Sequence, residues 1–258
     1  MIRVVLLGAA GRMGRAIAAA AGTADDVTIK ACIDREANFP EVGGVWTSSA
    51  ADVVAAGDVV ADFSSPEGTL EAASLCAERG AALVTGTTGL GEAHAAALKA
   101  AAARVAVLQA ANFSLGVLAL QRALRAALRA VPPGWDVEIV ERHHRAKLDS
   151  PSGTALVLAG EVRAGRGTET APLRHGREGW AGPRPGGEIG MHAVRGGTWV
   201  GDHTVLLAGE GEWLELRHVA QDRTAFATGA LAAARFVARA APGRYTLEHL
   251  ASDPGRVT

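Results

Sequence analysis

A glycine-rich turn separates the first apolar run of the chain from an alanine-rich stretch. The apolar run Ile2–Leu7 predicts a strand, and Arg12–Ala21 predicts a helix. Between them, Gly8, Gly11 and Gly14 have the spacing GxxGxxG. Glycines at such a turn allow a tight bend, close approach of a pyrophosphate to the backbone, and close packing of the helix on the strand. The start of the helix then offers its backbone N–H groups to phosphates. This turn therefore predicts a dinucleotide-binding site within a βαβ unit.

An acidic and a basic residue stand side by side where the second strand is expected to end. The strand is predicted over Val27–Ile33, and Asp34 and Arg35 follow it. Asp34 lies about 20 residues after Gly14, where an acid can bind the adenosine ribose hydroxyls. An acid favours NAD, whereas a neighbouring arginine can accommodate the 2′-phosphate of NADP. We therefore expect NADH and/or NADPH as the cofactor. The alternative, in which the glycines serve packing alone, stays open.

Short apolar runs alternate with helical stretches up to about residue 110. Beyond the segments above, the sequence predicts a short helix over Asp52–Ala56, a strand over Val59–Phe63, a helix over Pro66–Arg79, a strand over Ala82–Thr85, a helix over Glu92–Ala103 and a strand over Val105–Leu108. This alternation is typical of α/β folds with a mainly parallel, doubly wound sheet. Gly86–Gly89 (GTTG) follows one predicted strand at the sheet edge where ligands bind. It lacks the lysine of a P-loop, so we do not expect an NTP site there. We expect this loop beside the nicotinamide ring; a plain βα turn is the alternative.

The pattern changes in the second half of the chain, which predicts a second domain. There the sequence predicts a helix over Leu115–Val131, a strand over Asp136–Arg142, a helix from Ser152, a loop over residues 165–187, and strands over Glu188–Arg195, Thr204–Ala208 and Trp213–Val219. Gly209-Glu-Gly211 indicates a hairpin between the last two strands. This order is typical of an α+β domain with antiparallel pairing. A final helix over Thr224–Ala241 can pack back on the first domain.

Overall charge and composition exclude several classes of protein. The 26 basic and 27 acidic residues give a net charge of −1, so we expect no nucleic-acid partner and no attraction to an anionic membrane surface. The sequence contains no long uncharged apolar run, so we expect no transmembrane helix. Arg12 and Arg15 interrupt the apolar N-terminal stretch, whereas the apolar region of a secretory signal is uninterrupted. Cys32 and Cys76 lie singly in apolar runs, which indicates reduced, buried thiols in a cytoplasmic protein.

A cluster of polar residues follows the strand over Asp136–Arg142. It contains His143, His144 and Lys147, and then Ser152, Gly153 and Thr154 at a predicted helix start. Histidine suits proton donation near neutral pH, and a helix start can hold a carboxylate. We expect no metal site, because no HExxH motif or cysteine pair accompanies the histidines, and no serine nucleophile, because no GxSxG elbow is present. A capped helix beside surface histidines is the alternative.

Taken together, these motifs resemble those of the 4-hydroxy-tetrahydrodipicolinate reductase (dihydrodipicolinate reductase) family of bacterial lysine biosynthesis. The similar segments are GAAGRMG over 8–14, FSSPEGTL over 63–70, GTTG over 86–89, AANFS over 110–114, the stretch Glu141–Ala155, and further short motifs at 187–190, 195–197, 201–203 and 223–226. The resemblance covers nearly the whole chain, and the segment Glu141–Ala155 is the most specific. It implies a Rossmann-like dinucleotide-binding domain over residues 1–114 and 222–258. Residues 115–221 would then form an α+β domain for substrate binding and oligomerisation, in a homotetramer.

The resemblance also implies roles for individual residues. His143 would donate the proton, with Lys147 as its partner. The substrate, a cyclic imine with two carboxylates that loses water and then accepts hydride, would be bound by His144, Lys147, Ser152, Gly153, Thr154 and Thr88. The cofactor would be held by Gly8, Gly11, Arg12, Met13, Gly14, Asp34, Arg35, Gly86, Thr88, Ala111 and Phe113. Addition of hydride places negative charge on the ring, which explains the need for an acid and a nearby cation.

This chain departs from some members of the family at two positions. Ser65 stands where some members have a basic residue, and Asp34 stands where some have glutamate. The shorter Asp34 is expected to keep the ribose contact. Two other interpretations stay open on the residues themselves: a related NAD(P)-dependent dehydrogenase of another small anion, and a non-catalytic NAD(P) sensor.

Overall fold

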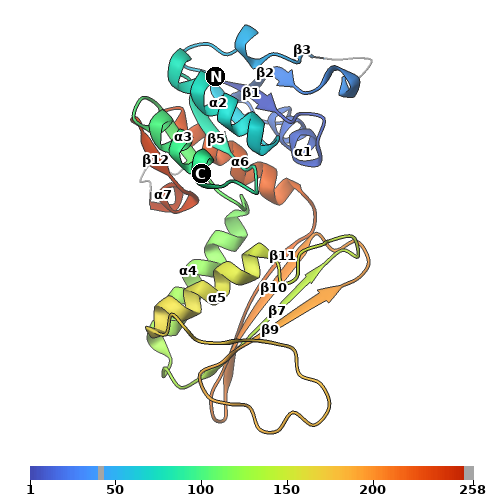
Figure 1. The fold of residues 1–258 in the computed structure, drawn as a ribbon, viewed down its shortest axis with the longest axis vertical. Coiled ribbons are helices and arrows are strands. Elements are labelled where there is room, and N and C mark those ends of the chain that lie inside the picture. The colour runs from blue at the N-terminus through green and yellow to red at the C-terminus, as the bar shows by residue number, and fades with distance from the viewer. Residues whose placement is uncertain (40–43, 253–258) are drawn as a thin grey trace. The chain divides into compact units, whose positions relative to one another are not determined.

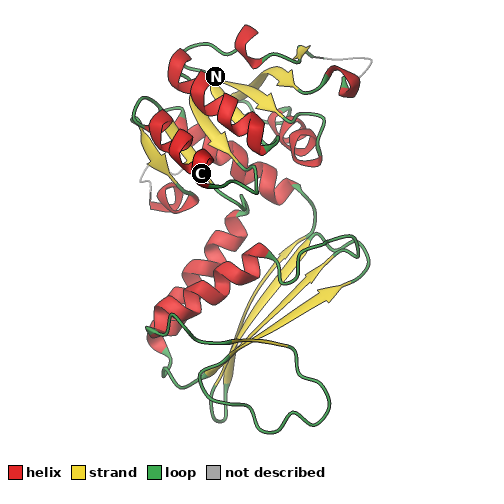
Figure 2. Cartoon of the chain, viewed as in Figure 1, coloured by secondary structure: helices red, strands yellow, loops and turns green. Residues whose placement is uncertain are grey.

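The computed structural model describes residues 1–39 and 44–252, and the chain divides into two compact units. Unit 1 consists of Met1–Leu115 together with the chain from Arg223 onward, and unit 2 of Gly116–Asp222. Figure 1 shows the elements of both units, and Figure 2 shows how helices and strands alternate in the first and gather separately in the second. None of the helices among the described residues has both the length and the apolar character that a membrane-spanning helix needs.

Unit 1 contains a parallel sheet with helices on both of its faces. Its strands are β1 (Ile2–Leu7), β2 (Val27–Ile33), β3 (Trp46–Thr47), β4 (Val59–Asp62), β5 (Ala82–Thr85), β6 (Ala106–Gln109) and β12 (Gly243–Tyr245). Its helices are α1 (Arg12–Ala21), α2 (Pro66–Arg79), α3 (Glu92–Ala102), α6 (Thr224–Val237) and α7 (Leu247–Ser252), with single 3-10 turns at Glu36–Asn38 and Ala50–Asp52. Figure 1 shows α2 and α3 together on one face of the sheet and α1 and α6 on the other.

The strand order of this sheet defines where a ligand can bind. Among the described residues the order is β12-β6-β5-β4-β1-β2-β3, and the paired strands all run parallel. The chain therefore builds outward from β1 through β2 to β3, then returns to place β4 on the other side of β1. Ligands of doubly wound folds bind beyond the carboxyl ends of the strands at such a reversal. The turns after β1 and β4 flank this point.

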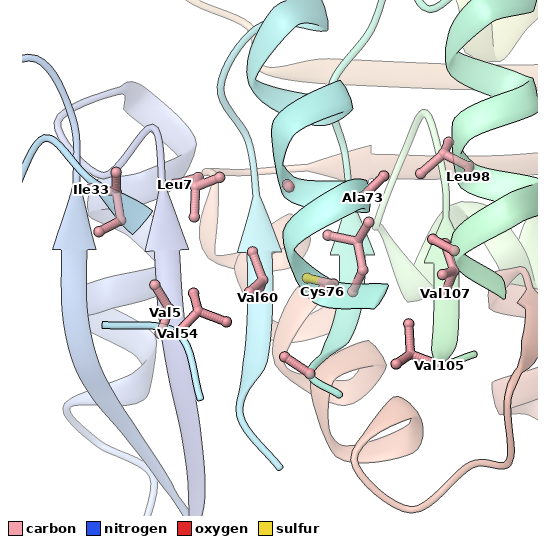
Figure 3. Packing of buried hydrophobic residues seen from close by; sticks show 14 of the residues in the cluster. Val5, Leu7, Ile33, Val54, Val60, Ala73, Cys76, Leu98, Val105 and Val107 are labelled. Carbon is pink, nitrogen blue, oxygen red and sulfur yellow. The ribbon is translucent and has the colours of Figure 1, made fainter. Parts of the chain in front are cut away.

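Apolar side chains from the strands of unit 1 form a core under α2 and α3. Val5, Leu7 and Val60 point toward these helices and pack with Cys76 of α2 and Leu98 of α3 (Figure 3). A sheet covered on both faces needs apolar residues on both sides of each strand, and this explains the continuous buried run Val4–Leu7 in β1. Cys76 and Cys32 are free and buried, as the sequence predicts.

Unit 2, whose residues are all described, consists of a mixed sheet covered on one face by two helices. Its elements are α4 (Leu115–Ala130, whose first residue belongs to unit 1), β7 (Asp136–His143), α5 (Gly153–Arg166), β8 (Leu173–His175), β9 (Ile189–Arg195), β10 (Gly201–Ala208) and β11 (Trp213–Ala220). The strand order is β11-β10-β7-β9-β8. β10 runs antiparallel to β7 and β11, whereas β7, β9 and β8 are mutually parallel. Ile139 and Val205 pack against Leu124 of α4 and Leu158 of α5.

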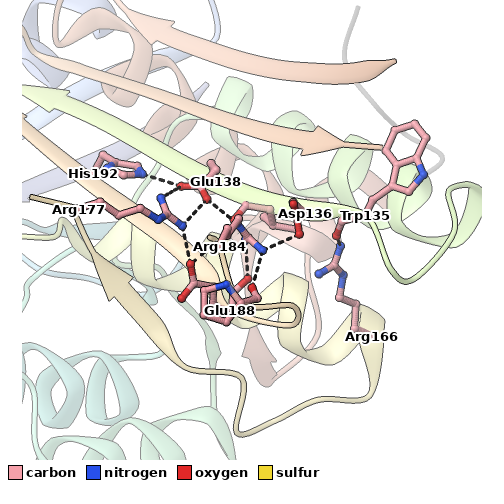
Figure 4. Close-up of polar contacts among 10 residues, drawn as sticks. Trp135, Asp136, Glu138, Arg166, Arg177, Arg184, Glu188 and His192 are labelled. Carbon is pink, nitrogen blue, oxygen red and sulfur yellow. Dashed lines mark hydrogen bonds and ion pairs between the residues drawn. The ribbon is translucent and has the colours of Figure 1, made fainter. Parts of the chain in front are cut away.

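On the opposite face of this sheet, ion pairs attach the long loop after β8 to β7. Arg177 and Arg184 both donate to Oε1 of Glu138 at 2.9 Å, and His192 Nε2 lies 2.6 Å from Oε2 of the same residue (Figure 4). Arg177 also pairs with Glu188 at the loop's end. Burial raises the pKa of Glu138, but the hydrogen bonds from Arg177, His192 and Arg184 outweigh it and bring the pKa to about 2. The loop is therefore fixed by charge rather than by an apolar core.

The fold class expected from the sequence is confirmed, with local errors. The helix predicted over Asp52–Ala56 is wrong, because the carbonyl of Val53 accepts from Lys30 Nζ and the N–H of Ala55 donates to the Asp58 side chain. The loop predicted over 165–187 contains β8, and the last long helix ends at Val237 instead of Ala241. The short elements β3, β12 and α7 were missed.

Candidate active site

The glycine turn of unit 1 is built so that two of its glycines tolerate no side chain. Gly8 has φ of 73°, a left-handed conformation, and a Cβ there would lie 2.4 Å from the carbonyl oxygen of Phe63. A Cβ on Gly14 would lie 2.3 Å from the carbonyl oxygen of Gly8. The turn after β1 therefore contacts both the start of α1 and the loop after β4. Gly11 and Arg12 are exposed at the helix start, and Met13 is half-buried.

Asp34 joins the end of β2 to this turn. Its Oδ2 accepts the backbone N–H of Ala10 at 2.9 Å, and its Oδ1 accepts from the N–H of Arg35 and the side chain of Asn38. Burial raises the pKa of Asp34, but these three hydrogen bonds together lower it below its usual value. Asp34 is therefore an ionised acceptor beside the turn, and Arg35 is exposed next to it.

A cavity of about 1160 Å³ lies beside the turn. Its lining includes Gly8, Gly11, Asp34, Arg35 and Ser65. The Ser65 hydroxyl accepts the N–H of Gly68 as the N-cap of α2, so the residue that departs from some relatives has a structural role here. Of the residues that the sequence assigns to the cofactor, Gly8, Gly11, Asp34 and Arg35 line this cavity, whereas Arg12, Met13 and Gly14 are not among its lining residues.

Two arginines lie near each other at the helix starts of unit 1. Burial and the nearby charge of Arg12 lower the pKa of Arg223, the N-cap residue of α6. Like charges held near each other favour the binding of an anion, because an anion relieves their repulsion. A dinucleotide supplies such anionic groups in its phosphates. The sequence assigned Arg12 to the cofactor but gave Arg223 no role.

The GTTG loop is anchored by a buried carboxylate. Asp62, at the end of β4, is fully buried and accepts hydrogen bonds from the hydroxyls of Ser64, Thr69, Thr85 and Thr87. These donors come from the loops after β4 and β5, from β5 itself and from α2, so one carboxylate connects both loops. Thr88 and Gly89 remain exposed at the end of the GTTG loop. No local pattern in the sequence indicates the role of Asp62, because its hydroxyl partners are up to 25 residues away.

Two phenylalanines close the space behind this loop. The rings of Phe63 and Phe113 are 5.2 Å apart, and a Cβ on Gly86 would lie 2.2 Å from the Phe63 ring and 2.9 Å from the Phe113 ring. Gly86 is therefore a packing requirement as well as a candidate backbone contact. Ala111, in the same segment as Phe113, is exposed.

In unit 2, the polar cluster forms at the end of β7. Alternation along this strand places Val137, Ile139, Glu141 and His143 on the face covered by the helices, and all four are buried. Nδ1 of His143 lies 2.6 Å from Oε2 of Glu141. Burial lowers the pKa of His143 and Glu141 opposes this, while Lys147 and Arg195 add to the lowering, so the pKa stays below its usual value.

Glu141 is a fully buried carboxylate with four donors around it. Besides His143, it accepts two hydrogen bonds of 2.7 Å from the guanidinium of Arg195 and one of 3.0 Å from the backbone N–H of Ser152. Burial raises its pKa, yet the hydrogen bonds from Arg195, His143 and Ser152 lower it overall. The sequence missed both Glu141 and Arg195; the position of Glu141 two residues before His143 on one strand was the available signal.

Ser152 caps α5 and contacts a second buried histidine. Its hydroxyl accepts the N–H of Ala155 and lies 3.0 Å from Nε2 of His203 on β10. The rings of His203 and His143 are 5.1 Å apart in an edge-to-face arrangement. Burial, followed by the charge of His143, lowers the pKa of His203 to about 4. Both the hydroxyl and the N–H of Ser152 thus have partners inside the protein, while Gly153 next to it is exposed.

The remaining residues of the cluster lie in the loop after β7. Lys147 Nζ pairs with Oδ1 of Asp149 at 2.8 Å, and this lysine holds the pKa of Asp149 below its usual value. The backbone of His144 is fixed by an N–H bond of 2.8 Å to the carbonyl of Trp199, and its side chain is half-buried. The structure therefore brings His143, Lys147 and the Ser152 turn together in unit 2, with Glu141, Arg195 and His203 beneath them.

Unit 1 is Rossmann-like and carries a dinucleotide turn, and unit 2 carries a histidine–carboxylate pair and a lysine. Together these features define an NAD(P)H-dependent oxidoreductase of a small substrate. Residues 2–113 match the family model described as dihydrodipicolinate reductase, N-terminus, and residues 116–250 match the one described as dihydrodipicolinate reductase, C-terminus. The chain belongs to the dihydrodipicolinate reductase family.

Individual relatives cover nearly the whole chain. The 4-hydroxy-tetrahydrodipicolinate reductase of Thermomicrobium roseum is 47% identical, over 97% of this chain and 99% of that protein. The enzyme of the same name from Alkalilimnicola ehrlichii is 42% identical, over 95% and 97%. Among solved structures, the dipicolinate-bound dihydrodipicolinate reductase of Paenisporosarcina sp. TG-14 is similar with a TM-score of 0.78 and 26% identity, over 95% of this chain and 97% of that one.

Proposed function

We propose that this chain reduces 4-hydroxy-tetrahydrodipicolinate to tetrahydrodipicolinate with NADH or NADPH, as a step of lysine and diaminopimelate biosynthesis. The observation that carries the proposal is the match of both halves of the chain to the two family models, the N-terminal model first and the C-terminal model second. The cluster around His143 supports it, because the reaction needs an acid and a cation beside the substrate.

The proposed roles follow the two units. In unit 1 the cofactor is held by Gly8, Gly11, Arg12, Met13, Gly14, Asp34, Arg35, Gly86, Thr88, Ala111 and Phe113. In unit 2 the substrate carboxylates are held by His144, Lys147, Ser152, Gly153 and Thr154. Because the hydroxyl and N–H of Ser152 already have partners, we propose the backbone of Gly153 as the first contact at this turn.

The chemistry of the residues is proton supply and charge stabilisation. The nicotinamide cofactor, when bound, supplies the hydride. The conjugated imine then carries negative charge, and the protonated form of His143 donates a proton to it. Lys147 stabilises the charge as it develops, with Asp149 restraining the lysine side chain. Asp34 and Arg35 together suit both NADH and NADPH, because the acid binds ribose hydroxyls and the arginine binds a 2′-phosphate.

We also propose that the protein acts in the cytoplasm as a homotetramer, on the resemblance to its family. The face of the unit 2 sheet away from α4 and α5 supports an interface, because Val194, Trp213 and Val219 on this face are exposed apolar side chains. A second copy of the same face is a suitable partner in a symmetric assembly. Light scattering on the purified protein tests the stoichiometry.

The test of the function is oxidation of NADH, and separately of NADPH, by purified protein given the fresh condensation product of pyruvate and aspartate semialdehyde. Rapid oxidation is expected. His143→Ala and Lys147→Ala are expected to lose about 100-fold to 10,000-fold in turnover while they still bind the cofactor. The matched control is Glu161→Gln, which breaks an ion pair with Arg125 between α4 and α5. No oxidation by protein that binds the cofactor contradicts the proposal, and a panel of other small anions then separates a related dehydrogenase from a sensor.

A further inference from the structure

We propose that Glu141 is a positioning residue that acts through His143. Its buried carboxylate keeps a proton on Nδ1 of His143, so that Nε2 is the nitrogen that takes up and gives away the proton used on the substrate. The inference deepens the proposed function and rests on it for the identity of the substrate. The observation behind it is the contact of 2.6 Å between Oε2 of Glu141 and Nδ1 of His143.

The other contacts of Glu141 determine the direction of that hydrogen bond. Both nitrogens that Arg195 contributes are donors, and so is the backbone N–H of Ser152. Each oxygen of Glu141 thus accepts at least one hydrogen bond from a group that can only donate. A carboxylate in this setting is ionised and carries no proton to give. The proton between Glu141 and His143 must therefore belong to Nδ1.

The surroundings of the other nitrogen favour its role in proton transfer. A Cβ at Gly201 would lie 3.3 Å from Nε2 of His143, so the glycine keeps this nitrogen uncovered on that side. His203 faces His143 from β10, but its Nε2 is occupied by the hydroxyl of Ser152. Nε2 of His143 is therefore better placed for proton transfer than Nε2 of His203.

Charges from several elements act on His143, and their balance explains why Glu141 matters. Glu141 lies on the same strand, Lys147 in the following loop, Arg195 on β9 and His203 on β10. Glu141 is the anion of this group, and the others are cations or can become cations. Without its negative charge, a buried imidazolium would face two fixed positive charges. Loss of the charge therefore lowers the pKa of His143 and depletes the acid that the reaction uses.

The first test is the tautomer of His143 in the full-length wild-type protein, measured by ¹⁵N NMR with labelled histidine. The signals are assigned by their loss in His143→Asn. The expected result is a neutral form with its proton on Nδ1. A neutral form with its proton on Nε2 overturns the proposal. This measurement needs neither a substrate nor a variant of Glu141, so it stands apart from the test of the proposed function.

The second test compares Glu141→Gln, Glu141→Asp and the control Glu161→Gln by NMR titration and by the pH profile of kcat. Glu141→Gln is expected to lower the pKa of His143 by about one unit or more, and to move the fall of kcat at high pH to lower pH by the same amount. KM for the cofactor stays unchanged. Glu141→Asp keeps the charge and restores part of the shift, and Glu161→Gln matches the wild type.

Two further outcomes are decisive. An unchanged pKa of His143 in folded Glu141→Gln overturns the proposal. If that variant does not fold, the same titration of Glu141→Asp decides. The expected pKa of His143 in Glu141→Asp is within one unit of the wild-type value, and a larger fall overturns the proposal. A wild-type protein that shows the expected tautomer and titration but does not oxidise the cofactor with the imine refutes the proposed function, and leaves the link between Glu141 and His143 supported.

Discussion

Asp34 accepts the backbone N–H of Ala10 at 2.9 Å, which ties the end of β2 to the glycine turn after β1. The same carboxylate accepts from the backbone of Arg35 and the side chain of Asn38 on its other oxygen. The residue that the sequence assigns to ribose recognition therefore also shapes the turn that is expected to receive the pyrophosphate. We therefore expect cofactor affinity and local stability to be coupled at this position.

Asp34→Asn is expected to weaken NADH binding about 10-fold or more and to lower the free energy of unfolding by about 1–2 kcal/mol, because hydrogen bonds to an ionised acceptor are lost. Fluorescence titration with NADH and denaturant unfolding measure the two effects. The control is Arg35→Ala, because the Arg35 side chain is exposed. This variant should bind NADPH more weakly and keep NADH binding and stability nearly unchanged. A loss of NADH affinity without any change in stability would contradict the coupling.

A second prediction concerns Asp62, which connects the loops after β4 and β5. Asp62→Asn removes the charge to which four hydroxyls donate, and it should lower the free energy of unfolding by about 1–3 kcal/mol and weaken cofactor binding. The matched control is Asp58→Asn, a buried carboxylate just before the other end of β4, paired with Arg3 and Lys30. The control should lose stability and keep its cofactor affinity. Equal losses of affinity in both variants would show that Asp62 acts only through general stability.

The sequence predicted the larger elements of the fold because their signals are local. β1, α1 and α2 have the predicted bounds, since an apolar run, a glycine turn and a proline at the first helical turn each specify structure within a few residues. The helix predicted over Asp52–Ala56 was wrong because backbone groups of this segment bond to the side chains of Lys30 and Asp58. β12 was missed because three residues carry too little pattern, and its pairing with β6 supplies the structure.

The candidate site was also only partly predictable from local sequence. His143 and Lys147 could be proposed from one short segment. Arg195 is 54 residues from Glu141, and His203 is 51 residues from Ser152, so the buried partners of the site follow only from the pairing of β7 with β9 and β10. No local pattern in a single sequence indicates such contacts.

Two glycines on helices are expected to respond oppositely to alanine. A Cβ on Gly14 in α1 would lie 2.3 Å from one backbone atom and 2.5 Å from another, so Gly14→Ala should lower the free energy of unfolding by about 2 kcal/mol or more. Gly160 in α5 is exposed and has no atom within 4 Å of such a Cβ. Gly160→Ala should therefore raise stability by about 0.5–1 kcal/mol, because alanine favours the helix. Denaturant unfolding of both variants measures the difference, and a shared sign would contradict the packing at Gly14.

His203 makes stability depend on pH. Its pKa is lowered from 6.5 to about 4 by burial and by the charge of His143, so the folded protein keeps it neutral where the unfolded chain protonates it. Between these two values the unfolded state binds more protons, and stability therefore falls as pH falls from about 6.5 toward about 4. The loss from this residue is about 3 kcal/mol at most across the window.

Unfolding free energies of the wild type and of His203→Gln at about pH 7 and about pH 5 test this dependence. The wild type should lose more stability between the two pH values than His203→Gln, whatever the variant's absolute stability. The control is His175→Gln on β8, where the side chain is exposed, and it should keep the wild-type dependence. Because His143 and His218 also have lowered pKa values from burial, part of the slope should survive in His203→Gln. An unchanged slope in His203→Gln would mean that His203 is already neutral in the unfolded state or still charged in the folded one.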